Sequence, residues 1–190
     1  LLEEAASVPA GADGLLLLPT FNGSSAPQVD LHARGALLGL TLAHGRGHVI
    51  RALLEGVAIE LRWMLDAMLA LGIKADEIRL VGGGAKNMYW NQIHADVLNR
   101  PVDTLAVPDA ALVGAAMCAS VAIGQYRNLD EATSGFVQTA RRLEPDQDHA
   151  QIYESVYENY RCAFSLLSSS GLFHRLAKQG EPSIPGSVDG

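Results

Sequence analysis

Short apolar runs alternate along the chain with longer segments in which apolar residues recur at helical spacing. Continuous apolar or β-branched runs are typical of buried strands. They occur at residues 15–18, 36–40, 78–81 and 102–105. Spacings of three or four residues predict amphipathic helices. They occur in residues 48–71, 90–98, 110–123 and 148–167. This order predicts an α/β domain in which helices flank a mixed sheet.

The spacing also predicts which helix faces are buried. The helix over residues 48–71 has one apolar stripe, formed by Val49, Leu53, Val57, Leu61, Leu65 and Met68. The last helix has another, formed by Ile152, Val156, Tyr160 and Phe164. Tyr153 and Tyr157 beside this second stripe are interpreted as packing aromatics. Small residues dominate the helix over 110–123, so we expect its part from Gly114 to Ser120 to be buried.

The two ends of the chain are expected to be less ordered than its middle. Serine, proline and glycine are frequent after residue 168, which predicts a disordered tail over residues 168–190. The stretch before Leu15 is also expected to be poorly ordered. The domain as a whole is assigned to residues 1–167, and the tail to residues 168–190.

Composition narrows the possible partners. A formal charge of −7 and a pI near 5.3 disfavour nucleic acid, whose phosphates attract a basic face. The longest weakly polar run, residues 110–124, is shorter than the roughly 20 residues of a membrane span. Cys118 and Cys162 are interpreted as buried reduced thiols, with a disulfide or a metal site as the alternative. This favours a cytoplasmic protein that contacts no membrane.

Three consecutive glycines, Gly82 to Gly84, lie where a strand passes into a helix. Glycine has no side chain to keep a ligand or another backbone away, and a helix start offers free amide groups. The residues that follow, Ala85-Lys86-Asn87, match neither the Gly-Lys-Ser/Thr phosphate loop nor a G-x-G-x-x-G turn. The spacing thus leaves open a nucleotide site and a tight turn that serves helix packing.

Other polar residues form no catalytic or metal-binding pattern. His44 and His48 are four residues apart but have no third ligand, so we interpret them as partly exposed residues at a helix start. Glu55 and Glu60 are expected to be solvated or paired with neighbouring arginines. We therefore predict no metal ligands in this chain.

Three ordered motifs resemble the C-terminal domain of the FGGY carbohydrate kinases. They are "LLLLPTFNGSSAPQVDLHARG", "RLVGGGAKNMYWNQIHADVLNRPV" and "DAALVGAAMCASVAIG", and the resemblance covers about Leu1 to Leu167. It implies an actin-like, ribonuclease H-like ATPase fold. It also implies an enzyme that uses ATP with Mg²⁺ to phosphorylate a hydroxyl of a small-molecule sugar, as well as a possible homodimer.

The resemblance assigns roles within the glycine turn. Gly83 matches the glycine whose backbone lies against the nucleotide, and Asn87 matches a residue near the adenine. Gly82 and Gly84 are expected to shape the loop around them. The helix start at Ala110–Ala115 matches a segment close to the nucleotide, although Leu112 stands where the family usually has a smaller residue.

The resemblance places the remaining machinery outside this chain. In the family, the N-terminal domain supplies a phosphate loop, most sugar contacts and the catalytic aspartate. We therefore expect no catalytic residue among Asp13, Asp30 and Asp96, and we interpret Asp96 as structural. The isolated chain is expected to be inactive, because phosphoryl transfer needs several groups positioned together.

The expected substrate is a pentulose such as D-xylulose. Asn22–Pro27 replaces the "SGERTP" motif of many sugar kinases, so ribulose, gluconate and glycerol stay open as alternatives. A noncatalytic nucleotide-binding module of the same fold is a further alternative, because a fold does not fix a function.

Overall fold

The structure, a computed structural model, describes residues 1–180, which form two compact units. Unit 1 comprises Leu1, Glu3–Ala67 and the chain from Ser155 onward. Unit 2 comprises Leu2 and Met68–Glu154. Two helices, α2 (Arg46–Ala70) and α6 (Gln147–Ser169), each begin in one unit and end in the other.

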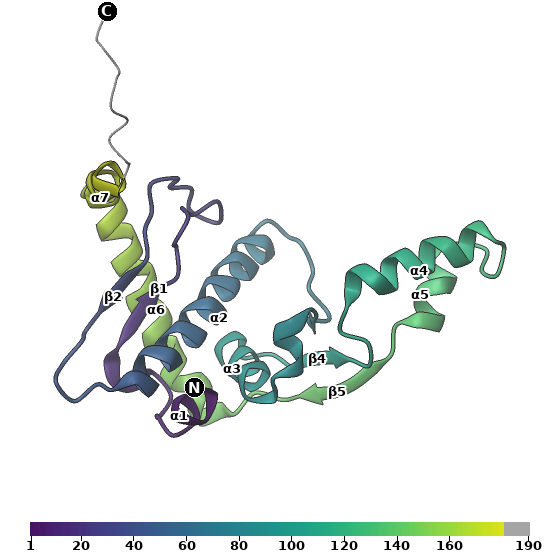
Figure 1. The fold of residues 1–190 in the computed structure, drawn as a ribbon, viewed down its shortest axis with the longest axis horizontal. Coiled ribbons are helices and arrows are strands. Elements are labelled where there is room, and N and C mark those ends of the chain that lie inside the picture. The colour runs from purple at the N-terminus through teal and green to yellow at the C-terminus, as the bar shows by residue number, and fades with distance from the viewer. Residues whose placement is uncertain (181–190) are drawn as a thin grey trace, which may run out of the picture. The chain divides into compact units, whose positions relative to one another are not determined.

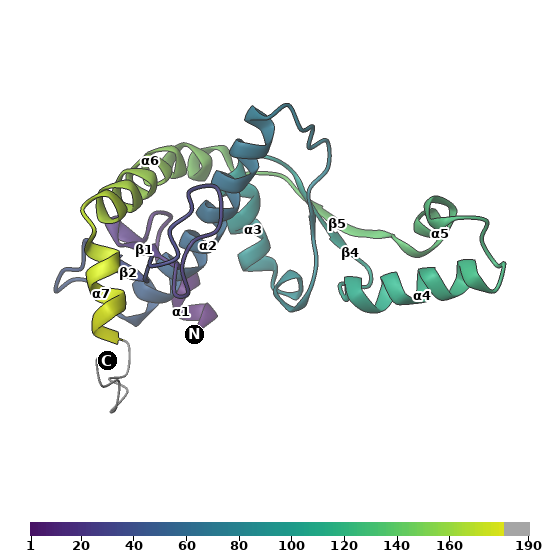
Figure 2. The same ribbon diagram turned by 90° about the horizontal axis from the view of Figure 1, so that it is seen from above.

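Unit 1 is built on two antiparallel strands, β1 (Leu16–Leu18) and β2 (Ala36–Leu38). Leu17 pairs with Leu37, and a long loop joins the strands. The later part of α6 runs along this pair of strands (Figures 1 and 2). The apolar core beneath β1 contains Val8, Ala12, Leu15, Leu17 and Ala52.

The chain before Leu15 is ordered, contrary to expectation. Helix α1 (Leu2–Ala6) begins the chain, and a 3₁₀ turn follows at Ala12–Gly14. Ala5 and Val8 are buried, and so is Ala12. Small apolar side chains that fit against α2 and β1 therefore hold a segment that was expected to be poorly ordered.

Helix α2 buries a different face from the predicted stripe. Its fully buried residues are Arg51, Ala52, Glu55, Gly56, Ala58 and Ile59. The predicted stripe is only half-buried, and Met68 at its end is 45% exposed. A Cβ atom at Gly56 would lie 2.3 Å from the carbonyl oxygen of Leu17. The helix thus packs against β1 through small residues, which a search for large apolar residues does not find.

On α6, the predicted apolar stripe is buried only at its two aromatic residues, Tyr160 and Phe164. The two tyrosines beside the stripe are buried as well. The side chains of Tyr153, Tyr157, Tyr160 and Phe164 are all buried. Ile152 is 43% exposed. The interpretation of Tyr153 and Tyr157 as packing residues is therefore confirmed.

The expected disordered tail is partly helical. Helix α7 (Leu172–Gly180) occupies most of residues 168–180. Phe173 is 1% exposed, and its ring lies 5.7 Å from that of Phe164. This aromatic contact anchors α7 despite the serines and glycine before it. The rest of the expected tail, residues 181–190, lies outside the described residues.

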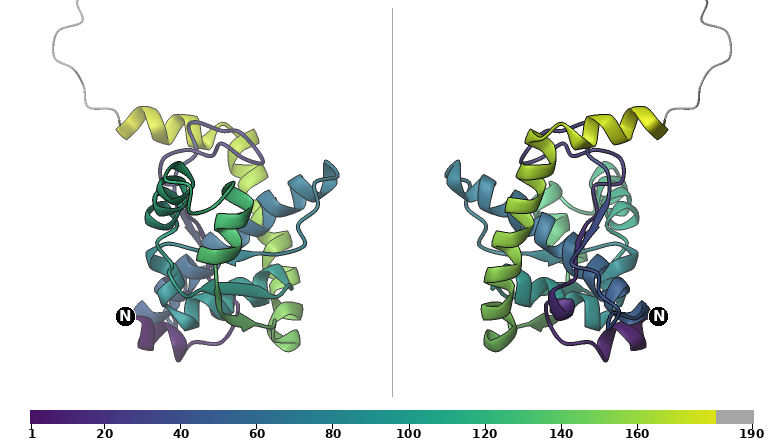
Figure 3. Two further views of the ribbon diagram at one scale, coloured as in Figure 1. Left: turned by 90° about the vertical axis from the view of Figure 1, so that its right-hand side faces the viewer. Right: turned by 90° about the vertical axis from the view of Figure 1, so that its left-hand side faces the viewer.

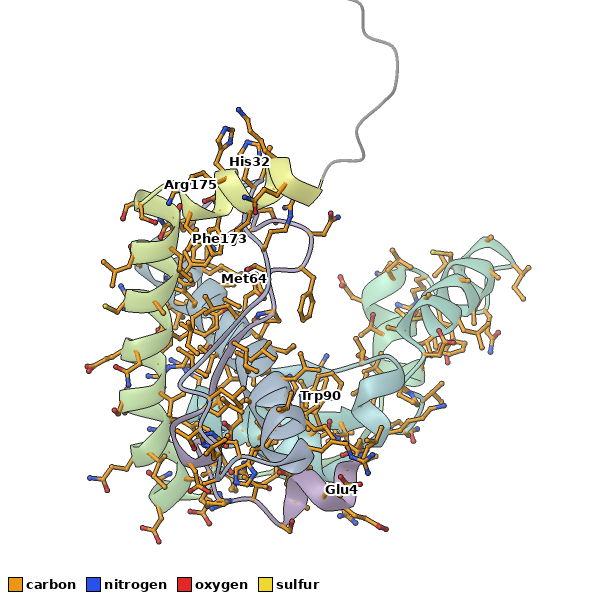
Figure 4. All side chains as sticks on the ribbon, turned by 60° about the vertical axis from the view of Figure 1, so that its left-hand side comes forward. Glu4, His32, Met64, Trp90, Phe173 and Arg175 are labelled. Atoms are coloured by element: carbon orange, nitrogen blue, oxygen red, sulfur yellow. The ribbon has the colours of Figure 1, made fainter. Side chains whose placement is uncertain are left out.

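Helix α7 lies beside the loop between β1 and β2 (Figure 3). The Ser168 hydroxyl donates a hydrogen bond of 2.6 Å to the Asp30 carboxylate. The rings of His32 and His174 meet edge to face, 4.5 Å apart. Figure 4 labels His32 of this loop and Phe173 and Arg175 of α7. The loop is therefore held by both α6 and α7.

Unit 2 contains the predicted mixed sheet, in the order β3-β4-β5. Strand β3 (Arg79–Leu80) is parallel to β4 (Val102–Leu105), and β4 is antiparallel to β5 (Thr139–Leu143). Helix α3 (Met88–Leu98) follows β3, as the apolar spacing predicts.

Two further helices of unit 2, α4 (Ala110–Ala122) and α5 (Leu129–Phe136), lie side by side (Figures 1 and 2). The expectation that α4 is buried is wrong, because Ser120 is its only buried residue. Leu112 is 67% exposed. The expected burial of both cysteines is also wrong, since Cys118 and Cys162 are free and exposed. An apolar composition with little variation around the helix does not identify a buried face.

Replacement of Gly114 tests this exposure. A Cβ atom at Gly114 would meet no heavy atom within 4 Å. Gly114→Ala is therefore expected to raise the free energy of unfolding by about 0.5 to 1 kcal/mol, because alanine favours a helix interior over glycine. Urea unfolding of the parent and the variant measures the change. A loss of stability would indicate that a neighbour covers this part of α4.

Candidate functional site

The glycine turn has a fixed backbone. Gly82 has a φ of 83° and a ψ of −169°, which residues with a side chain rarely adopt. Its N–H donates a hydrogen bond of 2.7 Å to the carbonyl oxygen of Pro108. A 3₁₀ turn over Gly83–Lys86 then leads into α3. The turn is therefore tied to the segment that precedes α4.

Asn87 and Asn91 secure the passage from the turn into α3. The Asn87 side-chain oxygen accepts a hydrogen bond of 2.9 Å from the N–H of Trp90 and so caps the helix. The Asn91 amide donates a hydrogen bond of 2.7 Å back to the carbonyl oxygen of Ala85. Asn91 is 1% exposed. These two side chains make the helix start rigid.

The three glycines differ in what surrounds them. A Cβ atom at Gly84 would lie 2.6 Å from the Trp90 ring, so Gly84 serves the packing of Trp90 on α3 (Figure 4). Gly82 provides the unusual backbone angle. A Cβ atom at Gly83 would meet nothing within 4 Å, and Gly83 is exposed. Gly83 is thus the glycine with an open face and an ordinary backbone.

The start of α4 lies next to the turn because Pro108 accepts the hydrogen bond from Gly82. Asp109 caps α4, and its carboxylate accepts a hydrogen bond of 3.1 Å from the N–H of Leu112. The Leu112 side chain projects into open space. Two segments that the sequence singled out separately are therefore adjacent in unit 2.

A pocket opens beside the turn. Its lining residues are Leu80, Val81, Gly84, Ala85, Trp90, Asn91 and His94. Asn91 and His94 belong to this site although the sequence motifs did not identify them. Helical spacing could have identified them. Asn91 follows Asn87 by one helical turn, and His94 follows Trp90 by one helical turn, so each lies on the same helix face as a residue of the turn or its pocket.

His94 is a neutral residue with a defined tautomer. It is 8% exposed, and burial lowers the pKa of its imidazole below the ordinary value of 6.5. Its Nδ1 lies 2.8 Å from the carbonyl oxygen of Trp90. A carbonyl oxygen only accepts hydrogen bonds, so Nδ1 carries the proton and donates.

His94 is therefore expected to make stability depend on pH. As the pH falls below 6.5, the unfolded chain binds a proton at this residue before the folded chain does. The stability contributed by neutral His94 is full above that pH and is lost below it. His94→Gln is expected to reduce the loss between about pH 7.5 and about pH 5.5, as measured by urea unfolding at both values. An unchanged pH dependence would contradict the burial of His94.

The aspartates excluded as catalytic bases are engaged in structural contacts. The buried Asp96 carboxylate accepts hydrogen bonds from the Gln92 amide at 2.7 Å, the Asp146 N–H at 2.8 Å and His149 Nδ1 at 3.0 Å. Asp96 thus joins α3 to the start of α6.

The other two aspartates lie in unit 1. Asp13 lies 3.1 Å from His48 Nε2. Asp30 bonds Ser168. Within residues 1–180, no group of three or more histidine, cysteine or acidic side chains could hold a metal. No helix in the same range is both long enough and apolar enough to cross a membrane.

Known proteins resemble this chain in sequence and structure. The profile of the FGGY family of carbohydrate kinases, C-terminal domain, matches residues 1–123. A xylulose kinase of Bacillus subtilis (strain 168) is 33% identical over 161 residues, which is 85% of this chain and 32% of that protein. A glycerol kinase of Vibrio parahaemolyticus serotype O3:K6 is 39% identical over 138 residues, which is 72% of this chain and 27% of that protein.

Structural similarity extends over more of the chain. The crystal structure of a xylulose kinase from Rhodospirillum rubrum has a TM-score of 0.77 and 38% identity, covering 90% of this chain and 34% of that one. The expected actin-like, ribonuclease H-like α/β fold is therefore confirmed. The chain spans about a third of the length of the relatives it matches.

Proposed function

The chain belongs to the FGGY family of carbohydrate kinases, and from this premise we propose that it is the nucleotide-binding part of a sugar kinase. The complete enzyme would transfer the γ-phosphoryl group of ATP to a sugar hydroxyl. The turn Gly82 to Asn87 would hold the adenosine, and the enzyme would act in the cytoplasm, where ATP and sugars are available.

The open face of Gly83 is the observation that carries the proposal. A turn that served helix packing alone would need Gly84, which lies against Trp90, but would not need a glycine at an exposed position with ordinary backbone angles. A flat nucleoside can approach the Gly83 backbone because no side chain intervenes. The cap by Asn87 and the hydrogen bond from Gly82 to Pro108 keep this surface in place before a ligand arrives. A preformed surface reduces the entropy lost on binding.

Mg²⁺ is proposed to enter the complete enzyme together with ATP. Magnesium in kinases is usually held by substrate phosphates with one or two carboxylates. Residues 1–180 provide no cluster of three or more suitable ligands, so Mg²⁺ would accompany the ATP phosphates. We propose that the proton-accepting aspartate and the phosphate loop of the complete enzyme lie outside this chain, in the region that corresponds to the uncovered part of its relatives.

The proposed sugar is a pentulose such as D-xylulose, because xylulose kinases are similar to this chain in both sequence and structure. Glycerol is the second candidate, since a glycerol kinase reaches 39% identity over a shorter stretch. Both substrates present a hydroxyl that can attack the γ-phosphorus. A noncatalytic module would bind nucleotide without transferring phosphate.

The test is an ADP-release assay on the full-length protein with Mg-ATP and each of D-xylulose, D-ribulose, gluconate and glycerol. We expect the largest kcat/KM with D-xylulose. A preference for glycerol would replace the proposed substrate, and nucleotide binding without turnover on any of them would favour the noncatalytic module. The isolated 190-residue chain, assayed in parallel, is expected to show no sugar-dependent turnover.

A further inference from the structure

One asparagine of the chain differs from the others in its surroundings. Asn22 is exposed and lies in a turn of the loop between β1 and β2, directly before Gly23. Its side chain has no hydrogen-bond partner among residues 1–180. Within this range, no bond therefore holds the amide away from the backbone that follows it.

The other asparagines are more restrained, and none of them precedes a glycine. Asn159 lies inside α6, where the N–H of the next residue belongs to the helix. The remaining four have side-chain amides that are hydrogen-bonded to the protein, namely Asn87, Asn91, Asn99 and Asn128. Asn22 is thus the asparagine that the next backbone nitrogen can reach most readily.

Position 23 requires glycine. Its φ is 85°, and a Cβ atom here would lie 3.0 Å from the carbonyl oxygen of Leu31. Because Gly23 has no side chain, nothing on this residue shields its backbone nitrogen from the Asn22 amide. The Gly23 N–H donates a hydrogen bond of 3.2 Å to the carbonyl oxygen of Ala33, at the upper end of the usual range. This bond must open before the nitrogen can attack.

We propose that Asn22 is a site of spontaneous deamidation. The Gly23 nitrogen attacks Cγ of Asn22, a new N–Cγ bond forms, and the Cγ–amide bond breaks. Ammonia leaves with the proton of the Gly23 N–H. Water then opens the resulting succinimide at either carbonyl carbon, which gives aspartate or isoaspartate. Water thus replaces ammonia, one negative charge is added, and nothing is oxidised or reduced.

The loop is sensitive to isoaspartate because its hydrogen bonds depend on register. The backbones of Ser24 and Asp30 exchange two hydrogen bonds of 2.9 Å. Isoaspartate at position 22 runs the backbone through its side chain and so adds one methylene just before this pair. The Asp30 carboxylate also accepts the hydrogen bond from Ser168 of α6. The modification is therefore expected to loosen the loop from α6.

Incubation of the full-length protein in mildly alkaline, heavy-oxygen water, followed by peptide mass spectrometry, tests the proposal. Asn22 is expected to acquire one heavy oxygen before any other asparagine does. Asn22→Gln keeps an amide but would have to close a larger ring, so it is expected to stay unmodified. A synthetic peptide of residues 19–27 gives the rate without the fold. An unmodified Asn22 after the peptide has converted would overturn the proposal, as would earlier conversion of another asparagine.

A pair of serine variants tests the restraint by the loop. Ser168→Ala removes the hydroxyl from Asp30, so the loop should open more often and Asn22 should react several-fold faster. Ser169→Ala is the control, because the Ser169 hydroxyl donates to the carbonyl oxygen of Leu166 within α6. It is expected to react at the parent rate. Equal rates in the parent and both variants would overturn the control of the reaction by the loop.

Discussion

Gly83→Val is expected to weaken ADP binding to the full-length protein by about thirtyfold, equivalent to about 2 kcal/mol, without lowering its stability. A Cβ atom at this position meets no protein atom within 4 Å, so the valine side chain occupies space outside the chain itself. If that space is where the nucleoside lies, the branched side chain excludes it. Titration calorimetry measures the affinity, and urea unfolding measures the stability.

Two glycine variants serve as controls. Gly45→Val also places a side chain in open space, but at the start of α2 in unit 1, and it is expected to leave ADP affinity unchanged. Gly84→Ala brings a Cβ atom within 2.6 Å of the Trp90 ring, so it is expected to lower stability. Equal ADP affinities for Gly83→Val and the parent would remove the turn from the nucleotide site.

Glu55→Ala is expected to lower the free energy of unfolding by about 3 to 5 kcal/mol. The side chains of Arg51 and Glu55 are 6% and 3% exposed, and Arg51 Nε lies 2.6 Å from Glu55 Oε1. The same carboxylate accepts a hydrogen bond of 3.0 Å from the N–H of Gly11. Arg51 also donates to the carbonyl oxygen of Val8. Alanine at position 55 would remove the carboxylate from a buried guanidinium and from a buried N–H.

The ion pair between Arg46 and Glu4 provides a matched control, because it also joins α2 to the N-terminal segment. Its two side chains are 71% and 40% exposed. Arg46→Ala is therefore expected to cost at most about 1 kcal/mol. Urea unfolding of both variants at low and high salt measures the difference. Similar losses for Glu55→Ala and Arg46→Ala would show that the Arg51–Glu55 pair does not anchor the N-terminal segment.

Much of the fold could be predicted because regular apolar spacing reflects local geometry. The strand at Val102–Leu105 and the boundaries of α2 match the predictions closely. Strand β5 has the sequence TARRL, of which only the leucine is buried, so it carries no apolar run that could identify it. The buried face of α2 depends on Gly56, whose absent side chain admits a distant strand.

The candidate site was only partly predictable, because its geometry also depends on how side chains pack in the folded chain. The glycine run identified the turn, but the sequence could not distinguish Gly83, which is open, from Gly84, which lies under Trp90. That distinction depends on the direction in which the Trp90 ring packs. His94 was not recognised, because a single histidine on a helix acquires a defined tautomer only through its bond to a backbone oxygen.

The division of the chain into units also has a consequence for the order of folding during synthesis. Apart from Leu2, unit 2 is one continuous stretch, Met68–Glu154, whereas unit 1 joins Glu3–Ala67 to the chain from Ser155. A ribosome releases the N-terminal stretch of unit 1 first, yet Tyr157, Tyr160 and Phe164 of α6, which complete its core, are made only after all of unit 2. Folding of unit 2 shortens the loop that unit 1 must close and so lowers the entropic cost of bringing its two stretches together. A chain that ends prematurely near Glu154 would therefore contain a complete unit 2 and would expose the apolar surface of an unfinished unit 1 to chaperones and proteases.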